Sequence, residues 1–337
     1  MKNFLKNNSL LVSIIIPCRN EEKYIGRCLD SIIAQNYPKE KSEVLVIDGM
    51  SEDRTREIIK NYSQKYSFIK LLNNPKKFIP SALNIGIKNS KGEIIIRMDS
   101  HAVYDKDYVL KCVEYLKKYK ADNVGGIIKT IPFRDTIIAR SIAFSLSHPF
   151  GVGGSHFRMG SKKTRAVDTV FGGCYKKGIF KEIGLFNENF IGGSEDMELN
   201  LRLKRAGGKI LLVPDIISYY YPKSNLIDFF LHNLRDGIWA IYPLKFVKIP
   251  LRLRHYIPLI FVLSLFVSLI LGLFFFFAKV LFILIFGSYL LLNLLFSLEI
   301  SFKKGLKYFF VLPIIFASRH IGYGLGSIWG IIKLLRG

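Results

Sequence analysis

The chain has 337 residues, which is room for one large domain with an appendage or for two modest domains. It carries 49 Lys and Arg against 26 Asp and Glu, a formal net charge of +23. A basic chain can bind nucleic acid through phosphate contacts. However, the sequence has no zinc-knuckle spacing, homeodomain-like helix or aromatic RNA-binding pattern, so we expect no nucleic-acid partner.

The first hundred residues alternate between apolar runs of strand length and amphipathic helices. Ile25, Leu29, Ile32 and Ile33 share one helix face, with Asn20 placed to cap that helix. Alternation of this kind predicts a Rossmann-like, doubly wound and mostly parallel sheet, which binds ligands beyond the carboxyl ends of its strands. The expected strands are Leu11–Ile16, Val44–Ile47, Ile69–Leu72 and Ile94–Met98.

The next hundred residues, Asp122–Tyr221, give a mixed α+β pattern. Within them, Pro149–Thr164 is rich in glycine and basic residues, which is typical of a mobile loop. A helix is expected after Ser194, running to about Ala206 before Gly207.

Beyond Ile216 the chain contains three acidic residues and becomes strongly apolar. Ile257–Phe277 and Val280–Leu298 are uncharged and long enough to cross a bilayer, so they predict a transmembrane hairpin interrupted near Lys279. The third apolar stretch, 308–332, could span, dip into or lie on the membrane. In each case Arg319 near its middle needs a partner.

These patterns predict three regions: a cytosolic domain at 1–222, a basic interfacial linker at 223–255 and a membrane domain at 256–337. Basic residues at Lys245–Arg254 and Lys303–Lys307 flank the hairpin, which favours a cytosolic location for both flanks. We therefore expect a multi-pass protein of the plasma (inner) membrane with a cytoplasmic catalytic domain.

Polar residues gather where the predicted strands end and before the later helix. Each group also has an ordinary structural interpretation, because Asp48-Gly49 is a common turn and Glu195-Asp196 suits the start of any helix. The groups are Pro17–Glu21, Asp48–Thr55, Asp99–His101 and Gly193–Leu199.

Taken in order, these motifs resemble family 2 inverting glycosyltransferases, which have the GT-A fold. The resemblance runs from Val12 to Val213 through SIIIP with Asn20-Glu21, VIDGMSEDRT, IPSALNIGI, Asp99 and EDMEL. The Asp99-x-His101 form and the apolar tail are most similar to the succinoglycan-type, membrane-anchored glucosyltransferases of exopolysaccharide biosynthesis.

The resemblance implies transfer of one sugar, a glucose-type hexose, from a UDP-sugar to a lipid-linked glycan acceptor in the membrane. It identifies Asp196 as the general base that takes the acceptor's proton, and Asp48 as the acceptor of a hydrogen bond from uracil. The residues that it implies in substrate binding are Pro17, Asn20, Glu21, Asp48, Ser51, Asn84, Arg97, Asp99 and Glu195.

The resemblance also implies a divalent metal ion that bridges Asp99 to the donor diphosphate. His101 stands where the family pattern usually has a second carboxylate. An imidazole ligand favours Mn²⁺ over Mg²⁺, although His101 could instead contact phosphate directly.

Two other functions fit the same frame. A polyprenyl-phosphate sugar synthase would transfer sugar to a lipid monophosphate, and a non-catalytic membrane module would only bind nucleotide sugar. A processive synthase is disfavoured, because a Gln-x-x-Arg-Trp segment is absent and the chain's glutamines are Gln35 and Gln64.

Overall fold

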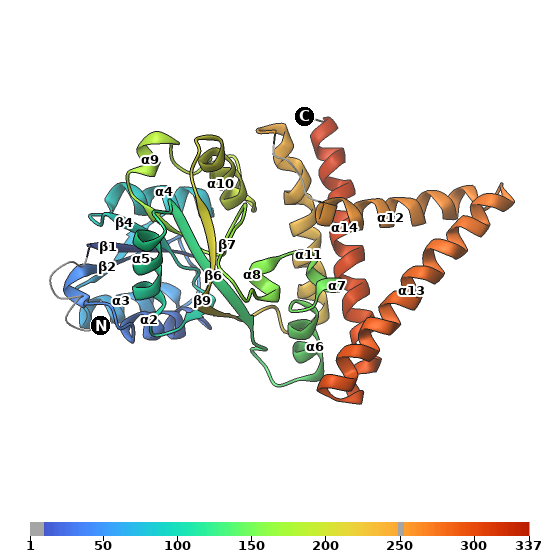
Figure 1. Ribbon diagram of the computed structural model, residues 1–337, viewed down its shortest axis with the longest axis horizontal. Helices are drawn as coiled ribbons and strands as arrows, with labels where there is room; N and C mark the ends of the chain where they lie inside the picture. Colours follow the sequence, from blue (N-terminus) through green and yellow to red (C-terminus); the bar gives the residue numbers. More distant parts are fainter. Residues whose placement is uncertain (1–9, 249–252, 337) are drawn as a thin grey trace. The chain divides into compact units, whose positions relative to one another are not determined.

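The computed structural model describes residues 10–248 and 253–336, which form two compact units (Figure 1). The first unit is the chain up to Lys129 with Gly160–Tyr220, and the second is Thr130–Met159 with Tyr221–Gly337. The sequence predicted a continuous catalytic domain at 1–222, whereas the structure groups 130–159 with the C-terminal helices. Arg252, in the predicted basic flank, lies outside the described residues.

The first unit is built on a mixed sheet with the strand order β3-β2-β1-β4-β8-β6-β9-β5, with β7 paired to β9. The pairs among β1 to β4 are parallel, which confirms the four predicted strands. Antiparallel pairs complete the other half. The strands are β1 Val12–Cys18, β2 Ser42–Asp48, β3 Ile69–Asn73, β4 Ile94–Arg97, β5 Ala102–Tyr104, β6 Asn123–Thr130, β7 Arg165–Ala166, β8 Cys174–Lys176 and β9 Ile210–Tyr220.

Helices cover both faces of this sheet, because alternate strand residues point to opposite sides. Ile14 and Ile16 of β1 belong to a core with α2, α3 and α5, while Ile15 belongs to a core with α4 and α10. The helices of the first unit are α2 Ile25–Ile33, η1 Lys39–Lys41, α3 Thr55–Lys65, α4 Ile79–Asn89, α5 Tyr108–Lys118, α9 Ile179–Glu182 and α10 Glu195–Arg205.

Asn20 does not cap α2, so that prediction was wrong. The helix begins after Tyr24 without a side-chain cap. Asn20 lies four residues earlier in a left-handed conformation (φ +55°), which asparagine tolerates better than most residues. Its side-chain oxygen accepts a hydrogen bond from the Glu52 backbone at 2.9 Å, so Asn20 joins the loops after β1 and β2.

The second unit is helical over the part of it that the structure describes. Residues 149–164, predicted as a mobile loop, contain two short helices, and the Phe150 ring packs on Phe316 with a centroid distance of 4.9 Å. The helices are α6 Ile137–Ser145, α7 Pro149–Val152, α8 His156–Met159, α11 Leu226–Ile241, η2 Tyr242–Lys245, α12 Leu253–Leu271, α13 Phe276–Lys304, η3 Leu306–Phe310 and α14 Leu312–Arg336.

Glycines let α11 and α14 approach closely. A Cβ built on Gly326 would lie 2.0 Å from the Leu234 carbonyl oxygen, and one on Gly237 would lie 2.0 Å from that of Tyr323. No side chain fits at either position, so the two backbones are in direct contact, as in small-residue helix interfaces of membrane proteins.

Two helices, α12 and α13, are long and apolar enough to cross a membrane. Only 22% and 11% of their most apolar windows are buried, so their large apolar side chains face outward. Their turn lies at Gly272–Phe275, earlier than the interruption expected at Lys279, which is in the first turn of α13. Glycine permits the tight reversal, whereas the long lysine stem is tolerated within a helix end.

Arg319 has the partner that the sequence required. Its Nη1 donates to the Asn233 side-chain oxygen at 2.7 Å, and its Nε donates to the Gly151 carbonyl. The guanidinium therefore connects α14 to α11 and to α7.

Candidate active site

The loop after β2 is organised around Asp48, whose side chain is fully buried. Ser51 donates to Asp48 from its hydroxyl at 2.5 Å and from its backbone at 3.1 Å. Arg56 in the first turn of α3 donates at 2.5 Å to Asp48 Oδ2, the carboxylate oxygen that also accepts from the Ser51 backbone. A direct bond from Asp48 to a nucleotide base, as the resemblance implies, requires one of these donors to share the carboxylate.

The loop after β1 is tied to the same region. The Asn20 backbone donates to the Ser51 hydroxyl at 2.9 Å, and the Glu21 backbone donates to the Thr55 hydroxyl at 2.7 Å. Pro17 sits at the end of β1 beside Ile47 of β2. The structure thus brings the predicted nucleotide-binding residues of β1 and β2 together at one edge of the sheet.

Arg97 links the end of β4 to the start of α10. Its Nε lies 3.1 Å from Asp99 and its Nη1 lies 2.8 Å from Glu195, and all three side chains are largely buried. Residues almost one hundred positions apart therefore share one ionic cluster.

The electrostatics of this cluster keep Asp99 charged. Burial alone would raise the pKa of the Asp99 carboxyl, but Arg97 and His101 outweigh it and hold the pKa below its ordinary value. Burial raises the pKa of the Glu195 carboxyl; Arg97 opposes this rise and Asp196 adds to it.

Asp196 is adjacent to this cluster and differs from Glu195 in its surroundings. It is half-buried, whereas Glu195 is 3% exposed. One carboxylate oxygen accepts from the Met197 backbone at 2.8 Å, and the other lies 3.4 Å from the Thr169 hydroxyl. The charge of Asp196 is thus stabilised at the start of α10, and its side chain remains accessible.

His101 and Asp99 supply only part of a metal site. The His101 ring lies beside an acidic residue of the loop after β1, with 3.5 Å between His101 Nδ1 and a Glu21 oxygen. Within residues 10–248 and 253–336 there is no cluster of three or more His, Cys, Asp or Glu side chains that could hold a metal. The pair fits an ion whose remaining ligands come from the substrate and water.

Asn84 lies apart from this cluster in its hydrogen bonding. It is buried in α4, where its side-chain oxygen accepts from the Phe186 backbone at 2.9 Å and its amide donates to the Phe186 carbonyl at 2.9 Å. Its amide also lies 3.0 Å from Glu188. Asn84 therefore links α4 by hydrogen bonds to Phe186 and Glu188, in the segment before α10.

Sequence reasoning missed Arg56 and Thr169. Arg56 follows Asp48 by eight residues on the helix after the loop, so the opposite charges were a usable signal. Thr169 contacts Asp196 and accepts from Asn200 at 3.1 Å, and no local pattern marks it.

Comparison with known proteins agrees with this geometry. The model of the family described as "Glycosyl transferase family 2" matches residues 13–184. A dolichyl N-acetyl-α-D-glucosaminyl phosphate 3-β-D-2,3-diacetamido-2,3-dideoxy-β-D-glucuronosyltransferase of Methanococcus voltae is 32% identical over 96% of this chain and 97% of its own length. A succinoglycan biosynthesis protein of Rhizobium meliloti is 30% identical over 64% of this chain and 65% of its own.

Solved structures show the same fold. A mannosyltransferase from Pyrobaculum calidifontis, in complex with GDP-Man and Mn²⁺, aligns with a TM-score of 0.59 at 17% identity, covering 96% of this chain and 92% of that one. The fold is GT-A, a mixed sheet with helices on both faces, followed by apolar helices. The chain belongs to glycosyltransferase family 2, which confirms the family and the enzyme class predicted from its motifs.

Proposed function

We propose that this enzyme transfers one sugar from a UDP-sugar to a lipid-linked glycan at a membrane surface, with inversion at the anomeric carbon. The observation that carries the proposal is the ionic cluster in which Arg97 joins Asp99 to Glu195, because it assembles donor-side and acceptor-side residues beside Asp196. The Methanococcus relative, which acts on a dolichyl-linked sugar phosphate by its name, supports a lipid-linked acceptor.

In this proposal Asp196 is the general base. The acceptor hydroxyl attacks the anomeric carbon, the bond from that carbon to the diphosphate oxygen breaks, and the hydroxyl proton passes to the Asp196 carboxylate. Its half-buried position in the first turn of α10 leaves the carboxylate accessible to an acceptor. Glu195 is buried against Arg97 and serves instead to orient the cluster.

The loops after β1 and β2 would bind the nucleotide, with Pro17, Asn20, Glu21, Asp48 and Ser51 around it. Asp99 and His101 would hold a divalent ion, which when bound neutralises the departing diphosphate. Solved relatives of this fold contain Mn²⁺ by their descriptions, which supports a metal of this kind.

The membrane supplies the acceptor in this proposal. Helices α12 and α13 are apolar, outward-facing and long enough to span hydrocarbon, so they would anchor a multi-pass protein in the plasma (inner) membrane. Basic residues on both flanks of the hairpin favour a cytoplasmic catalytic unit.

The test compares Asp196→Asn with Glu195→Gln in purified full-length enzyme. Asn at 196 can still accept from the Met197 backbone, so the fold and UDP binding should persist. It cannot take a proton, so transfer should fall by at least about 10²-fold. Glu195→Gln weakens the bond to Arg97 and should give an intermediate rate.

The outcome separates the alternatives. If Glu195→Gln abolishes transfer while Asp196→Asn does not, the general base is Glu195 and not Asp196. If neither slows transfer, the acceptor arrives ionised, as in a polyprenyl-phosphate sugar synthase. If UDP binds and no UDP-sugar supports transfer to lipid extracts, the chain is a binding module.

A further inference from the structure

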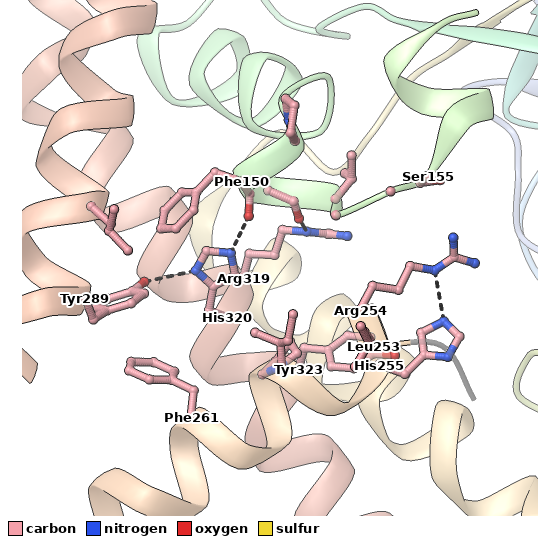
Figure 2. Close-up of a pocket in the computed structure, with 18 of the residues that line it drawn as sticks. Phe150, Ser155, Leu253, Arg254, His255, Phe261, Tyr289, Arg319, His320 and Tyr323 are labelled. Atoms are coloured by element: carbon pink, nitrogen blue, oxygen red, sulfur yellow. Dashed lines mark hydrogen bonds between the residues drawn. The ribbon is translucent and has the colours of Figure 1, made fainter. Parts of the chain in front are cut away.

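A cavity of about 690 Å³ lies within the second unit (Figure 2). Four segments line it: the α7–α8 region, the first turns of α12, the middle of α13 and the middle of α14. Its volume is in the range of small-molecule sites.

One side of the cavity carries three cationic arginines and two histidines. Arg158, Arg254 and Arg319 line it together with His255 and His320. None of the described lining residues is acidic. Guanidinium groups bind phosphate with paired, charge-assisted hydrogen bonds, so this composition favours a phosphate-bearing ligand.

Hydrogen bonds hold this side in place before any ligand binds. His320 Nε2 donates to the Phe150 carbonyl at 2.8 Å, and the Tyr289 hydroxyl lies 3.1 Å from His320 Nδ1 (Figure 2). Together with the bonds from Arg319 to Gly151 and Asn233, they fix α7, α11, α13 and α14 around the cavity. A fixed polar wall lowers the entropy cost of binding.

The other side is apolar and comes from the two helices that could cross a membrane. Ile257 and Phe261 belong to α12, and Ile285 and Leu292 belong to α13. A soluble anion would gain nothing from these side chains, whereas a lipid tail buries apolar surface against them. A ligand that combines a phosphate with a hydrocarbon chain would match both the basic and the apolar part of this lining.

We propose that this cavity binds the phosphate group and the first part of the hydrocarbon chain of a long-chain lipid phosphate. Within the proposed function, on which this assignment of the lipid rests, that lipid carries the acceptor glycan. Arg158, Arg254 and Arg319 contact the phosphate, and the apolar residues of α12 and α13 contact the chain. Binding of the lipid by this cavity requires neither the sugar donor nor the catalytic residues.

The test uses radiolabelled farnesyl phosphate and purified full-length protein in detergent, measured by equilibrium binding. Farnesol, which has no phosphate, and inorganic phosphate, which has no chain, should each compete at least about ten-fold less well. The double variant Arg158→Gln/Arg254→Gln should weaken binding at least about ten-fold. Arg235→Gln, an exposed arginine of α11 outside the cavity, is the matched control and should leave binding unchanged.

A second variant tests the apolar side without changing charge. Ser288 of α13 lines the cavity and is exposed, so Ser288→Phe adds bulk there at little cost to folding. It should weaken farnesyl phosphate binding while UDP binding, which reports the first unit, stays normal. Equal binding by wild type, the double variant and Ser288→Phe would overturn the inference, as would competition by inorganic phosphate as strong as that by farnesyl phosphate.

Failure of this inference is distinct from failure of the proposed function. Transfer that proceeds normally in the double variant, with unchanged farnesyl phosphate binding, overturns the cavity and leaves the transferase intact. Cavity-dependent binding without transfer from any UDP-sugar overturns the proposed function and leaves the lipid-phosphate site standing.

Discussion

The contact between α11 and α14 gives a sharp prediction about stability. Replacing Gly326 by Ala places a Cβ 2.0 Å from the Leu234 carbonyl oxygen, where ordinary contacts begin at 3.4 Å. Neither atom can move alone, because both belong to backbones inside helices. The two helices must therefore separate by more than about an ångström, which loosens their whole interface.

The cost follows from two opposing effects. Overpacking of this kind destabilises by about 1–3 kcal/mol, while Ala is a better helix former than Gly by about 1 kcal/mol. A Cβ 2.0 Å from a backbone oxygen is a severe overlap, which places this case in the upper part of the overpacking range, at about 2–3 kcal/mol. After the helix-propensity gain we therefore expect a net loss of about 1–2 kcal/mol in the free energy of unfolding of the second unit. For a unit of this size that lowers the melting temperature by roughly 2–8 °C.

Tryptophan fluorescence during heating in detergent measures this change directly. The chain's two tryptophans, Trp239 and Trp329, lie in α11 and α14, so both report on the altered interface. Gly287→Ala is the matched control, because a Cβ at this position of α13 meets nothing within 4 Å. Its melting temperature should stay the same or rise. If Gly326→Ala melts like Gly287→Ala, the two helices are not in the close contact described.

Three further predictions concern the rest of the molecule. Asn84→Ala leaves the Phe186 backbone groups without their hydrogen-bond partner and should lower the free energy of unfolding by about 1–3 kcal/mol, with UDP binding intact. Loss of UDP binding at normal stability would instead show that Asn84 contacts the sugar donor. Chelation with EDTA should abolish transfer, and Mn²⁺ should restore it at least as well as Mg²⁺. Full activity in metal-free buffer would show that Asp99 is not a metal ligand. Phe274 lies in the turn between α12 and α13 and is 76% exposed, so the cysteine of Phe274→Cys should react with an impermeant thiol reagent on intact cells. The background should be low, because the four native cysteines are buried. Reaction only after lysis would show that the turn faces the cytoplasm.

The first half of the catalytic fold could be predicted because its information is local. Each parallel strand is a continuous apolar run, and each following helix repeats its apolar residues on one face. The strand ends could be located for the same reason, so the sequence alone points to Asp48 and Asp99. The start of α10 was marked by Ser194 and the acidic residues after it.

What the sequence could not predict depends on contacts between distant residues. In the sequence nothing pairs Arg97 with Glu195, because they are almost one hundred positions apart. Only the packing of β4 near α10 brings them into one ionic cluster with Asp99. The short strands β7 and β8 have two and three residues, too few for a periodic pattern. Glycines around Phe150 suggested a loop, because the partner of this ring, Phe316, lies far along the chain.

The membership of residues 130–159 in the second unit has a consequence for biosynthesis. Ile142, Leu146 and Val152 are buried against Phe229 of α11 and Ile315 of α14, which leave the ribosome much later. At common rates of synthesis the delay before Ile315 emerges is on the order of tens of seconds. During that interval the apolar side chains of residues 130–159, which interrupt the first unit in the sequence, cannot yet be buried against α11 and α14. Burial of this segment is therefore delayed until the C-terminal helices have been synthesised, and a fragment that stops at residue 222 would leave the segment exposed to aggregation.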